Sequence, residues 1–317
     1  MSKIEAKITQ VTPLTERICE FRLASTDGAA LPTFAPGAHV LFDLPDGETR
    51  AYSLIAFEPI RPTPQEYRIA VQREPEGKGG SKYMHGLEAG AAITCALPKN
   101  DFPLNLDAPA VLLAGGIGIT PMISMATTLM DHKQEFVFHY SGRSASLMAY
   151  RDVLRGSLGD KLHLHCDDDP LSALDLDGVI ADLGPTAHLY VCGPKGLIDA
   201  TKAKAEVAGI AAARIHFELF DAPQEEVGDT AFEVELASTG AVFTVIPGQS
   251  IIEALEEGGV DVMYDCQRGD CGICQCDVIS GTPDHRDVVL SEAERAAGKV
   301  MQICVSRAKS PRLVLDI

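Results

Sequence analysis

The stretch that decides the fold is CQRGDCGIC, residues 266–274, and one further cysteine, Cys304, follows after 29 intervening residues. The spacing C-x4-C-x2-C with a distant fourth cysteine is typical of a plant-type 2Fe–2S cluster. A tight loop can bring three thiolates to two iron atoms, and a later strand must return the fourth. Gly269 and Gly272 suit such a loop, because backbone amides must approach the sulfurs closely. The sequence therefore predicts an iron–sulfur site with the ligands Cys266, Cys271, Cys274 and Cys304.

Two other uses of these cysteines compete with a cluster. A zinc site usually shows paired C-x2-C units, often with histidine, and the x4 gap fits that pattern less well. Structural disulfides need an oxidising compartment, and nothing in the sequence suggests export. Cys276 lies two residues beyond Cys274 and is predicted to be a bystander. The remaining cysteines are scattered and are expected to behave as small apolar residues: Cys19, Cys95, Cys166 and Cys192.

The composition is that of a soluble globular protein, with 46% hydrophobic and 23% charged residues, and 317 residues suffice for two or three domains. The first residues run directly into an alternating strand pattern, so no signal peptide is expected. Residues 108–130 carry no charge and are long enough to suggest a membrane span. Glycines 115, 116 and 118 and the pair Thr120-Pro121 interrupt that stretch, which favours a buried strand, a glycine turn and a helix start.

The chain is strongly acidic, with a net charge of −18, which argues against nucleic acid as a partner. The acid is concentrated at the carboxyl end, because residues 224–317 hold 17 acidic against 7 basic residues. Such a surface either serves solubility or presents a negative face to a basic redox partner. The sequence leaves both interpretations open.

The strand and helix patterns divide the chain into three domains. Residues 1–104 are predicted to form a small β-barrel, because short strands alternate with Gly, Pro and Asp turns. Residues 105–222 alternate strands with helices, which is the pattern of a doubly wound α/β domain. The predicted strands are 4–8, 18–23, 39–44, 50–54, 67–71, 110–114, 136–140, 162–165 and 188–192, and the predicted helices are 122–130, 148–154 and 196–208.

A linker is predicted at residues 223–231, within a charged stretch that has no apolar periodicity. The last domain, residues 232–317, opens with a hairpin formed by 232–237 and 241–246. A short helix at 250–257 then precedes the cysteine loop, and Ser250 is a good N-cap for it. The fold class is therefore multi-domain α/β plus β.

Two turns at the carboxyl edge of the predicted parallel sheet are candidates for a nucleotide site. GGIGITP, residues 115–121, follows the first strand, and its glycines would let the backbone approach a pyrophosphate. Thr120 suits the cap of the next helix and Pro121 its first position. A turn without a ligand is the alternative, because this is not the G-x-G-x-x-G fingerprint. Cys192-Gly193-Pro194 ends a later strand at the same edge, where ligands bind in open α/β sheets.

The barrel domain carries two further candidate motifs. In RAYSL, residues 50–54, Arg50 would meet a phosphate, Tyr52 would stack or hydrogen-bond, and Ser53 would reach a ring nitrogen of a flat anionic cofactor. GKGGS, residues 77–81, is a possible phosphate cradle, and a flexible hairpin turn is the alternative. It lacks the P-loop spacing.

These motifs occur in the same order in the phthalate dioxygenase reductase family, which includes vanillate demethylase reductases, and the sequence resembles that family over its whole length. The motifs are RAYSL, GGS at 79–81, residues 115–122, CGP at 192–194, FELF at 217–220 and the cysteine set. The resemblance implies a flavin-binding β-barrel, a pyridine-nucleotide domain and a C-terminal β-grasp ferredoxin domain. Cys276 is a departure, since a non-cysteine residue is expected there.

The resemblance also implies roles for individual residues. The flavin, expected to be FMN, would be held by Arg50, Ala51, Tyr52, Ser53, Val71, Gln72, Gly79, Gly80 and Ser81, with Phe220 covering its ring. NADH would be bound by Gly116, Gly118, Thr120, Pro121, Cys192, Gly193 and Pro194. Ser53 and Cys192 are the expected catalytic residues, Cys192 lying near the nicotinamide. Arg143 follows a strand where the adenosine ribose binds, and it could accept a 2′-phosphate of NADPH, although the family prefers NADH. His85 is expected to be a surface or packing histidine.

Together these features predict a cytoplasmic, NADH-dependent reductase. A nicotinamide donates two electrons as a hydride, whereas a 2Fe–2S cluster accepts one at a time, and a flavin can divide the pair. The expected acceptor is a Rieske-type oxygenase component, with no membrane and no nucleic acid involved. The alternatives are a reductase that serves a cytochrome or a quinone, and a non-enzymatic protein with a zinc-type cysteine site. The substrate of the oxygenase and the oligomeric state are not encoded in any motif.

Overall fold

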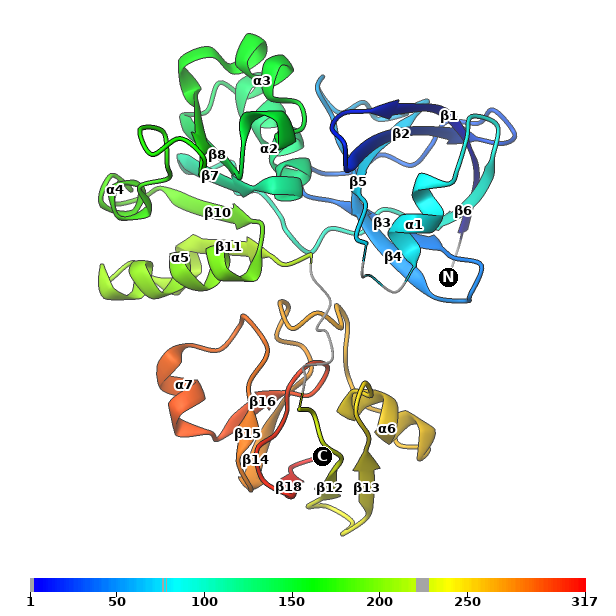
Figure 1. Ribbon diagram of the computed structural model, residues 1–317, viewed down its shortest axis with the longest axis vertical. Coiled ribbons are helices and arrows are strands. Elements are labelled where there is room, and N and C mark those ends of the chain that lie inside the picture. Colours follow the sequence, from blue (N-terminus) through cyan, green and yellow to red (C-terminus); the bar gives the residue numbers. More distant parts are fainter. Residues whose placement is uncertain (1–2, 76, 78, 221–227) are drawn as a thin grey trace. The chain divides into compact units, whose positions relative to one another are not determined.

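The computed structural model describes residues 3–75, 77, 79–220 and 228–317 (Figure 1). The chain divides into two compact units, Met1–Glu218 and Leu219–Ile317. The first unit contains both the predicted barrel and the predicted α/β domain. Most of the predicted linker, residues 223–227, lies outside the described part of the chain.

A six-stranded antiparallel sheet with the order β4-β3-β6-β1-β2-β5 forms the barrel part of the first unit. Alternate residues of its strands face the core. In β1, Ile4, Ala6 and Ile8 are buried, while the residues between them are exposed. The predicted strands are confirmed within a few residues. The bounds are β1 Lys3–Pro13, β2 Ile18–Ser25, β3 His39–Asp43, β4 Thr49–Ser53, β5 Tyr67–Gln72, α1 Gly80–His85 and β6 Ala92–Ala96.

A five-stranded parallel sheet with the order β11-β10-β7-β8-β9 forms the rest of the first unit. Figure 1 shows α2 and α3 on one side of this sheet and α5 on the other, which is the doubly wound arrangement. The bounds are β7 Ala110–Gly115, η1 Gly116–Gly118, α2 Ile119–Asp131, β8 Phe136–Gly142, η2 Ala145–Leu147, α3 Arg151–Leu158, η3 Gly159–Lys161, β9 Leu162–Cys166, α4 Leu176–Ala181, β10 His188–Cys192, α5 Lys195–Val207, η4 Ala212–Arg214 and β11 Ile215–Glu218.

The strand order reverses between β7 and β10, because the chain moves from β7 toward β8 and later returns to the other side of β7. Residues 115–121 and 192–194 follow these two neighbouring strands, so both predicted nucleotide turns lie at the switch point. The uncharged stretch 108–130 becomes β7, η1 and α2 as expected. Among the described residues, no helix is both long and apolar enough to cross a membrane.

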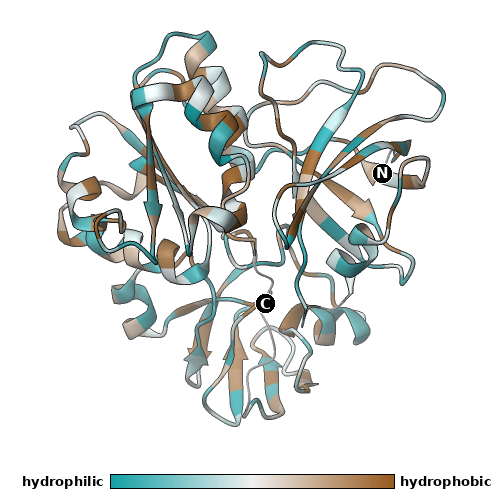
Figure 2. Ribbon diagram, turned by 45° about the horizontal axis from the view of Figure 1, so that its top comes forward, coloured by the Kyte–Doolittle hydropathy of each residue, from teal (hydrophilic) through white to brown (hydrophobic). Residues whose placement is uncertain are grey.

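The second unit has a five-stranded sheet with the order β13-β12-β18-β14-β16 and a small two-stranded sheet of β15 and β17. Apolar and polar residues alternate along its strands, seen as brown and teal bands in Figure 2, and the apolar ones form a single core. The predicted hairpin is confirmed as β12 and β13. The bounds are β12 Phe232–Leu236, β13 Val242–Val245, α6 Ile251–Glu257, β14 Gln275–Ser280, β15 Pro283–Asp284, α7 Glu292–Ala297, β16 Val300–Gln302, β17 Arg307–Ala308 and β18 Arg312–Leu315.

Helix α6 begins as the sequence predicts. The Ser250 hydroxyl accepts a hydrogen bond from the Glu253 amide, and the Glu253 carboxylate accepts one from the Ser250 amide, which completes a capping box. The helix packs on the core of the second unit and delivers the chain to the cysteine loop.

Candidate functional site

The four predicted ligand cysteines converge in the second unit. Cys266, Cys271 and Cys274 lie in the loop between α6 and β14, and Cys304 lies just after β16. The Cys304 thiol lies within hydrogen-bonding reach of Cys266 and Cys274, which lowers the pKa of both, and Cys271 lies within reach of Cys266. Residues separated by up to 38 positions are thus brought into sulfur–sulfur contact by the fold.

Backbone geometry shapes the loop around these sulfurs. Gln267, Gly269 and Gly272 have positive φ angles of 52°, 78° and 78°. A Cβ on Gly269 would stand 2.7 Å from Val305 Cγ2, so this glycine is required by packing as well as by its φ angle. The Arg268 amide donates to Cys266 Sγ at 3.3 Å. Hydrogen bonding with Cys304, followed by the Asp270 side chain and then by such amide contacts, lowers the pKa of the Cys266 thiol against the opposing effect of burial.

This donor set suits a cluster better than a single ion. In the part of the chain that the structure describes, no three His, Cys, Asp or Glu side chains are arranged to hold one metal ion. Ligands of a two-iron cluster need not converge on one point, because two thiolates bind each iron atom. Four adjoining thiols with amide donors nearby therefore fit a 2Fe–2S cluster, which would accept and release one electron at a time.

Two residues beside the cluster loop need comment: Cys276, which the sequence predicted to be a bystander, and Gln302, which it did not single out. Cys276 lies on β14 opposite Met301 and packs against the apolar core, and burial raises the pKa of its thiol to about 12. This placement matches the bystander role. Gln302, which no sequence motif identified, is fully buried, and its side chain contacts Cys274 Sγ at 3.5 Å and Gln275 Oε1 at 3.0 Å.

The predicted flavin residues gather on one side of the barrel. Arg50 on β4 lies across the start of α1, since its Cγ is 2.9 Å from the position of a Cβ on Gly80. Gly79 precedes the helix with φ 107°, and the Ser81 hydroxyl accepts a hydrogen bond from the Glu74 amide at 3.0 Å. The segment predicted as a cradle or a hairpin turn is therefore a helix start beside a guanidinium, which suits a phosphate.

Ser53 is the clearest sign of a ligand in the barrel. It is 4% exposed, and among the described residues its Oγ has no hydrogen-bond partner. A buried hydroxyl without a partner is costly, so a bound group with a polar ring atom would satisfy it. Two residues earlier on the strand, Ala51 is half-buried; next to Ser53, burial raises the pKa of Tyr52 to about 12.

Strand β5 carries two of the predicted flavin residues, Val71 and Gln72. The Val71 side chain is 1% exposed, and its carbonyl lies 2.9 Å from His85 Nε2. His85 is thus a packing histidine that ties α1 to β5, as expected. Gln72 is half-buried, and its side-chain amide donates to Glu74 at 2.5 Å.

The two nucleotide turns pack directly on each other. A Cβ on Gly118 would stand 2.2 Å from the Cys192 carbonyl oxygen, and one on Gly193 would stand 2.9 Å from Gly115 Cα. Gly116 differs, because it has φ 56° and no described atom lies within 4 Å of its Cβ position. Most of these glycines therefore permit close backbone packing, and Gly116 leaves the open space that a ligand requires.

The start of α2 corrects one expectation. The helix begins at Ile119 with Gly118 at the N-cap, and Thr120 Oγ1 donates to the Ile117 carbonyl at 3.1 Å instead of capping the helix. Pro121 is consequently the third helical residue and not the first. It remains compatible with the helix, because amides of the first turn have no intrahelical partner.

A buried histidine–carboxylate pair near these turns was missed by sequence reasoning. Glu218, 3% exposed, pairs with Cys192 in the β10–β11 ladder. Its Oε1 lies 3.9 Å from Nδ1 of His39, which is opposite Ser53 in the β3–β4 ladder. These contacts link the surroundings of Ser53 to those of Cys192. The available signal was a carboxylate at the end of the short strand that precedes the second unit.

Two predicted residues lie neither in the barrel nor in the two nucleotide turns. Arg143 is exposed after β8, where the Asp168 amide donates to its carbonyl at 3.1 Å. Phe220 is half-buried in the second unit, just past the boundary between the units. Its predicted position over the flavin stays a prediction.

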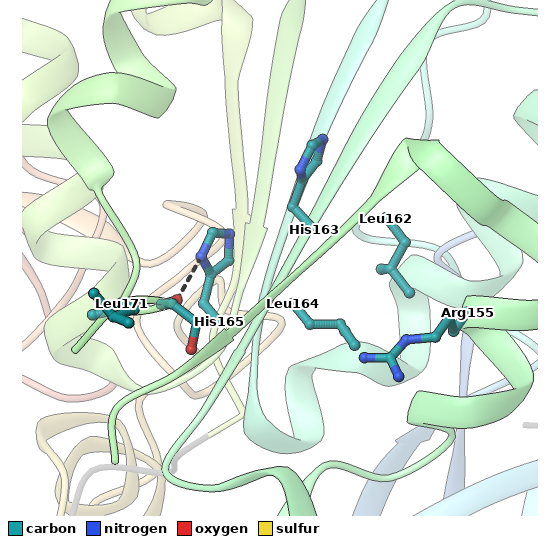
Figure 3. Close-up of a pocket in the computed structure, with 8 residues that line it drawn as sticks. Arg155, Leu162, His163, Leu164, His165 and Leu171 are labelled. Atoms are coloured by element: carbon teal, nitrogen blue, oxygen red, sulfur yellow. Dashed lines mark hydrogen bonds between the residues drawn. The ribbon is translucent and has the colours of Figure 1, made fainter. Parts of the chain in front are cut away.

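A pocket of about 480 Å³ on strand β9 contains none of the predicted site residues (Figure 3). His163 and His165 line it, and His165 Nδ1 lies 3.1 Å from the Ser172 carbonyl. The ring of His139 on β8 stacks on both. This pocket is therefore separate from the candidate site.

Comparison with known proteins agrees with this geometry. Residues 234–309 match the family model of the 2Fe–2S iron–sulfur cluster binding domain. The chain is 40% identical to phenoxybenzoate dioxygenase subunit beta of Ectopseudomonas oleovorans, with 100% of this chain and 98% of the relative covered. It is 39% identical to tetrachlorobenzoquinone reductase of Sphingobium chlorophenolicum, with 100% and 99% covered.

A solved structure is similar over the same length. It is phthalate dioxygenase reductase, described as a modular structure for electron transfer from pyridine nucleotides to a 2Fe–2S cluster. The TM-score is 0.75 at 35% identity, with 100% of this chain and 98% of that chain covered. The barrel, the doubly wound domain and the four-cysteine loop define an oxidoreductase with a C-terminal 2Fe–2S ferredoxin domain. The chain belongs to the phthalate dioxygenase reductase family.

Proposed function

We propose that this protein is an NADH-dependent flavin iron–sulfur reductase that passes electrons singly from FMN through its 2Fe–2S cluster to a Rieske-type oxygenase component. The observation that carries the proposal is the convergence of Cys266, Cys271, Cys274 and Cys304. A bound flavin would supply the conversion of a two-electron hydride into single electrons.

The chain's own residues bind and orient the cofactor. Arg50 and the first amides of α1 would hold the FMN phosphate, and the Ser53 hydroxyl would hydrogen-bond a ring atom. Tyr52 provides an aromatic surface beside them. FMN is proposed over FAD because the family resemblance favours it and no motif supplies an adenine site in the barrel.

The nucleotide occupies the switch point of the parallel sheet. The open backbone at Gly116 and the start of α2 would receive the pyrophosphate, and Cys192, which ends the neighbouring strand, would lie near the nicotinamide. Three exposed aspartates at 167–169 adjoin Arg143, since the Asp167 and Asp168 amides donate to the carbonyls of residues 142 and 143. Their charge would repel a 2′-phosphate, which supports NADH over NADPH.

The proposed electron acceptor follows from the relatives. Similar full-length proteins are named for dioxygenase, demethylase and carnitine monooxygenase systems. A quinone is the second candidate acceptor, because one relative at 39% identity is named tetrachlorobenzoquinone reductase.

The proposed domains are residues 1–104, 105–222 and 232–317, with a linker at 223–231. A cytoplasmic location is proposed because none of the nine cysteines forms a disulfide, as is usual in a reducing compartment.

Anaerobic titration tests the proposal. Stoichiometric NADH should bleach a yellow chromophore first and then the broad absorbance of a cluster, and a rhombic paramagnetic signal should appear. Oxidation of the reduced protein by a candidate oxygenase should be at least tenfold faster than by benzoquinones. A chromophore that bleaches without a paramagnetic signal would overturn the proposal, and faster oxidation by quinones would favour the second acceptor.

A further inference from the structure

Two hydroxyl groups tie helix α2 to the end of the flavin strand. Ser124 Oγ donates to the Leu54 carbonyl at 2.7 Å and accepts a hydrogen bond from the Ala56 amide at 2.9 Å. Thr127 Oγ1 donates to the Ala56 carbonyl at 2.8 Å. One turn of the helix thereby holds both ends of the segment 54–56.

The tie lies between the two parts of the proposed site. Leu54 directly follows Ser53, whose buried hydroxyl is proposed to contact the flavin. Ser124 lies five residues after Ile119, where α2 begins at the nucleotide turn. At about 1.5 Å per helical residue, Ser124 is about 7.5 Å along the axis from that turn. The link therefore connects the flavin strand to the nucleotide turn through one rigid element.

The surroundings of the tie allow little adjustment. Ser124 and Leu54 are fully buried. The backbone of the segment is also held from the barrel side, because the Leu54 amide donates to Ala38 and the Ile55 amide to Arg68, both at 2.8 Å. Removing the Ser124 hydroxyl would leave the partly buried Ala56 amide and the buried Leu54 carbonyl without this partner. The segment would then either shift relative to α2 or lose the free energy of these hydrogen bonds.

We propose that Ser124, assisted by Thr127, is a positioning residue for hydride transfer, setting the distance between the nucleotide turn and the flavin strand. The inference rests on the proposed function, which places nicotinamide and flavin at these two elements. Hydride transfer requires reacting atoms about 3–3.5 Å apart, and a displacement of about 1 Å can lower the rate by about 100-fold. A link that fixes two binding elements therefore affects the rate without touching either ligand.

The test uses the purified flavin-loaded protein and matched variants. Ser124→Ala removes both hydrogen bonds of the serine, and Thr127→Val removes one hydroxyl at nearly constant volume. Thr128→Val is the control, because Thr128 Oγ1 donates at 2.8 Å to the Ser124 carbonyl within the same helix and makes no link to the barrel in the hydrogen bonds described.

Two readouts are expected to move together. In single-turnover mixing with NADH, the flavin reduction rate of Ser124→Ala should fall by about 10- to 100-fold, while the Kd of NADH changes less than about threefold. Hydrogen exchange of the Ala56 amide, measured in the oxidised protein without nucleotide, should accelerate by about tenfold. Thr127→Val should show a smaller rate loss of about two- to tenfold, and Thr128→Val should match the wild type.

The outcomes separate positioning from stability. If Ser124→Ala exchanges faster and melts at lower temperature but is reduced at the wild-type rate per bound flavin, the proposal is wrong and the link is structural. If Ser124→Ala does not fold with flavin, Thr127→Val decides, and an unchanged reduction rate in that variant overturns the proposal. Failure of the proposed function is distinguishable, because wild-type flavin would then not be reduced by NADH.

Discussion

The cysteine loop of the second unit and the flavin–nucleotide region of the first unit build their sites in different ways. In the loop, chemistry resides in side chains whose spacing is visible in nine consecutive residues, 266–274. In the first unit, the candidate residues come from separate elements, β4, the turn after β7 and the end of β10, and they meet only across the fold, as Gly118 meets Cys192. One local motif predicts the cysteine site, whereas in the first unit each motif predicts a single turn or strand and only the assembled fold shows which of them meet.

The largest expected effect tests the local character of the cysteine loop. Cys304→Ser should lose the cluster, because a serine hydroxyl is a poor substitute for a thiolate on iron. Electron transfer to a one-electron protein acceptor should fall by roughly 100-fold or more, while NADH still reduces the flavin within about twofold. Iron content and paramagnetic resonance measure this. Cys276→Ser is the control and should keep the cluster; the opposite result would mean a different ligand set.

The packing of the two nucleotide turns predicts the next largest effect. Gly118→Ala places a Cβ 2.2 Å from the Cys192 carbonyl oxygen, so the turns must separate. The free energy of unfolding of the first unit should fall by about 3 kcal/mol, and NADH should bind about tenfold more weakly. Gly116→Ala faces open space and carries the cost of φ 56° alone, about 1 kcal/mol. Denaturant unfolding compares the two, and a larger loss for Gly116→Ala would refute this account.

Acid should weaken the first unit before the second, since burial lowers the pKa of His139, His165 and His216 in Met1–Glu218, whereas in the described part of the second unit it lowers only that of His285. Burial, followed by the neighbouring His165 and His163, lowers the pKa of His139 to about 4. The unfolded chain, with a histidine pKa of about 6.5, therefore binds protons first, and stability is lost as pH falls from 6.5 toward 4. After allowance for partial exposure, we expect a loss of about 2 kcal/mol.

Urea unfolding at several pH values, followed by hydrogen exchange in each unit, measures this difference. His139→Phe should flatten the slope of stability against pH in the first unit. An equal slope in both units would show that histidines do not distinguish them.

A smaller effect is expected from a second tie within the first unit. Tyr150, at φ 60°, donates its hydroxyl to Glu20 Oε2 at 2.8 Å in a buried site. Tyr150→Phe should cost about 1–2 kcal/mol, or roughly 3–6 °C in Tm. The exposed pair of Tyr264 with Glu256 in the second unit is the matched control, and Tyr264→Phe should cost below about 0.5 kcal/mol. Equal shifts in calorimetry would contradict the role of burial.

The smallest expected effect concerns nucleotide choice. Changing Asp167, Asp168 and Asp169 together to Asn should raise kcat/KM for NADPH by about tenfold, because charge repulsion near Arg143 is removed. The value for NADH should stay within about threefold. Asp160→Asn, an exposed change in η3, is the control. Unchanged NADPH kinetics in the triple variant would place the 2′-phosphate elsewhere.

Much of the fold was predictable because the apolar pattern of each strand indicates which of its residues are buried. The apolar run at 110–114 became β7, and the Ser250 capping box began α6 as expected. The start of α2 was not predictable at residue level, since Thr120 resembles a cap but donates to Ile117. Helix α1 was not predicted for a different reason. Its six residues, Gly80–His85, are too few to show a helical period of apolar residues.

The sequence alone determined the fold class, the presence of a 2Fe–2S domain and the class of reaction, and it predicted the cluster ligands, because each depends on residue types at short, fixed spacing. Tertiary structure decided which groups meet: His39 with Glu218, Ser124 with Leu54 and Ala56, and Gly118 with Cys192. Their separations in the chain range from 68 to 179 residues, and no local pattern encodes such a contact. Long-range contacts arise when buried faces and backbone hydrogen bonds are satisfied together, which happens only in the folded chain.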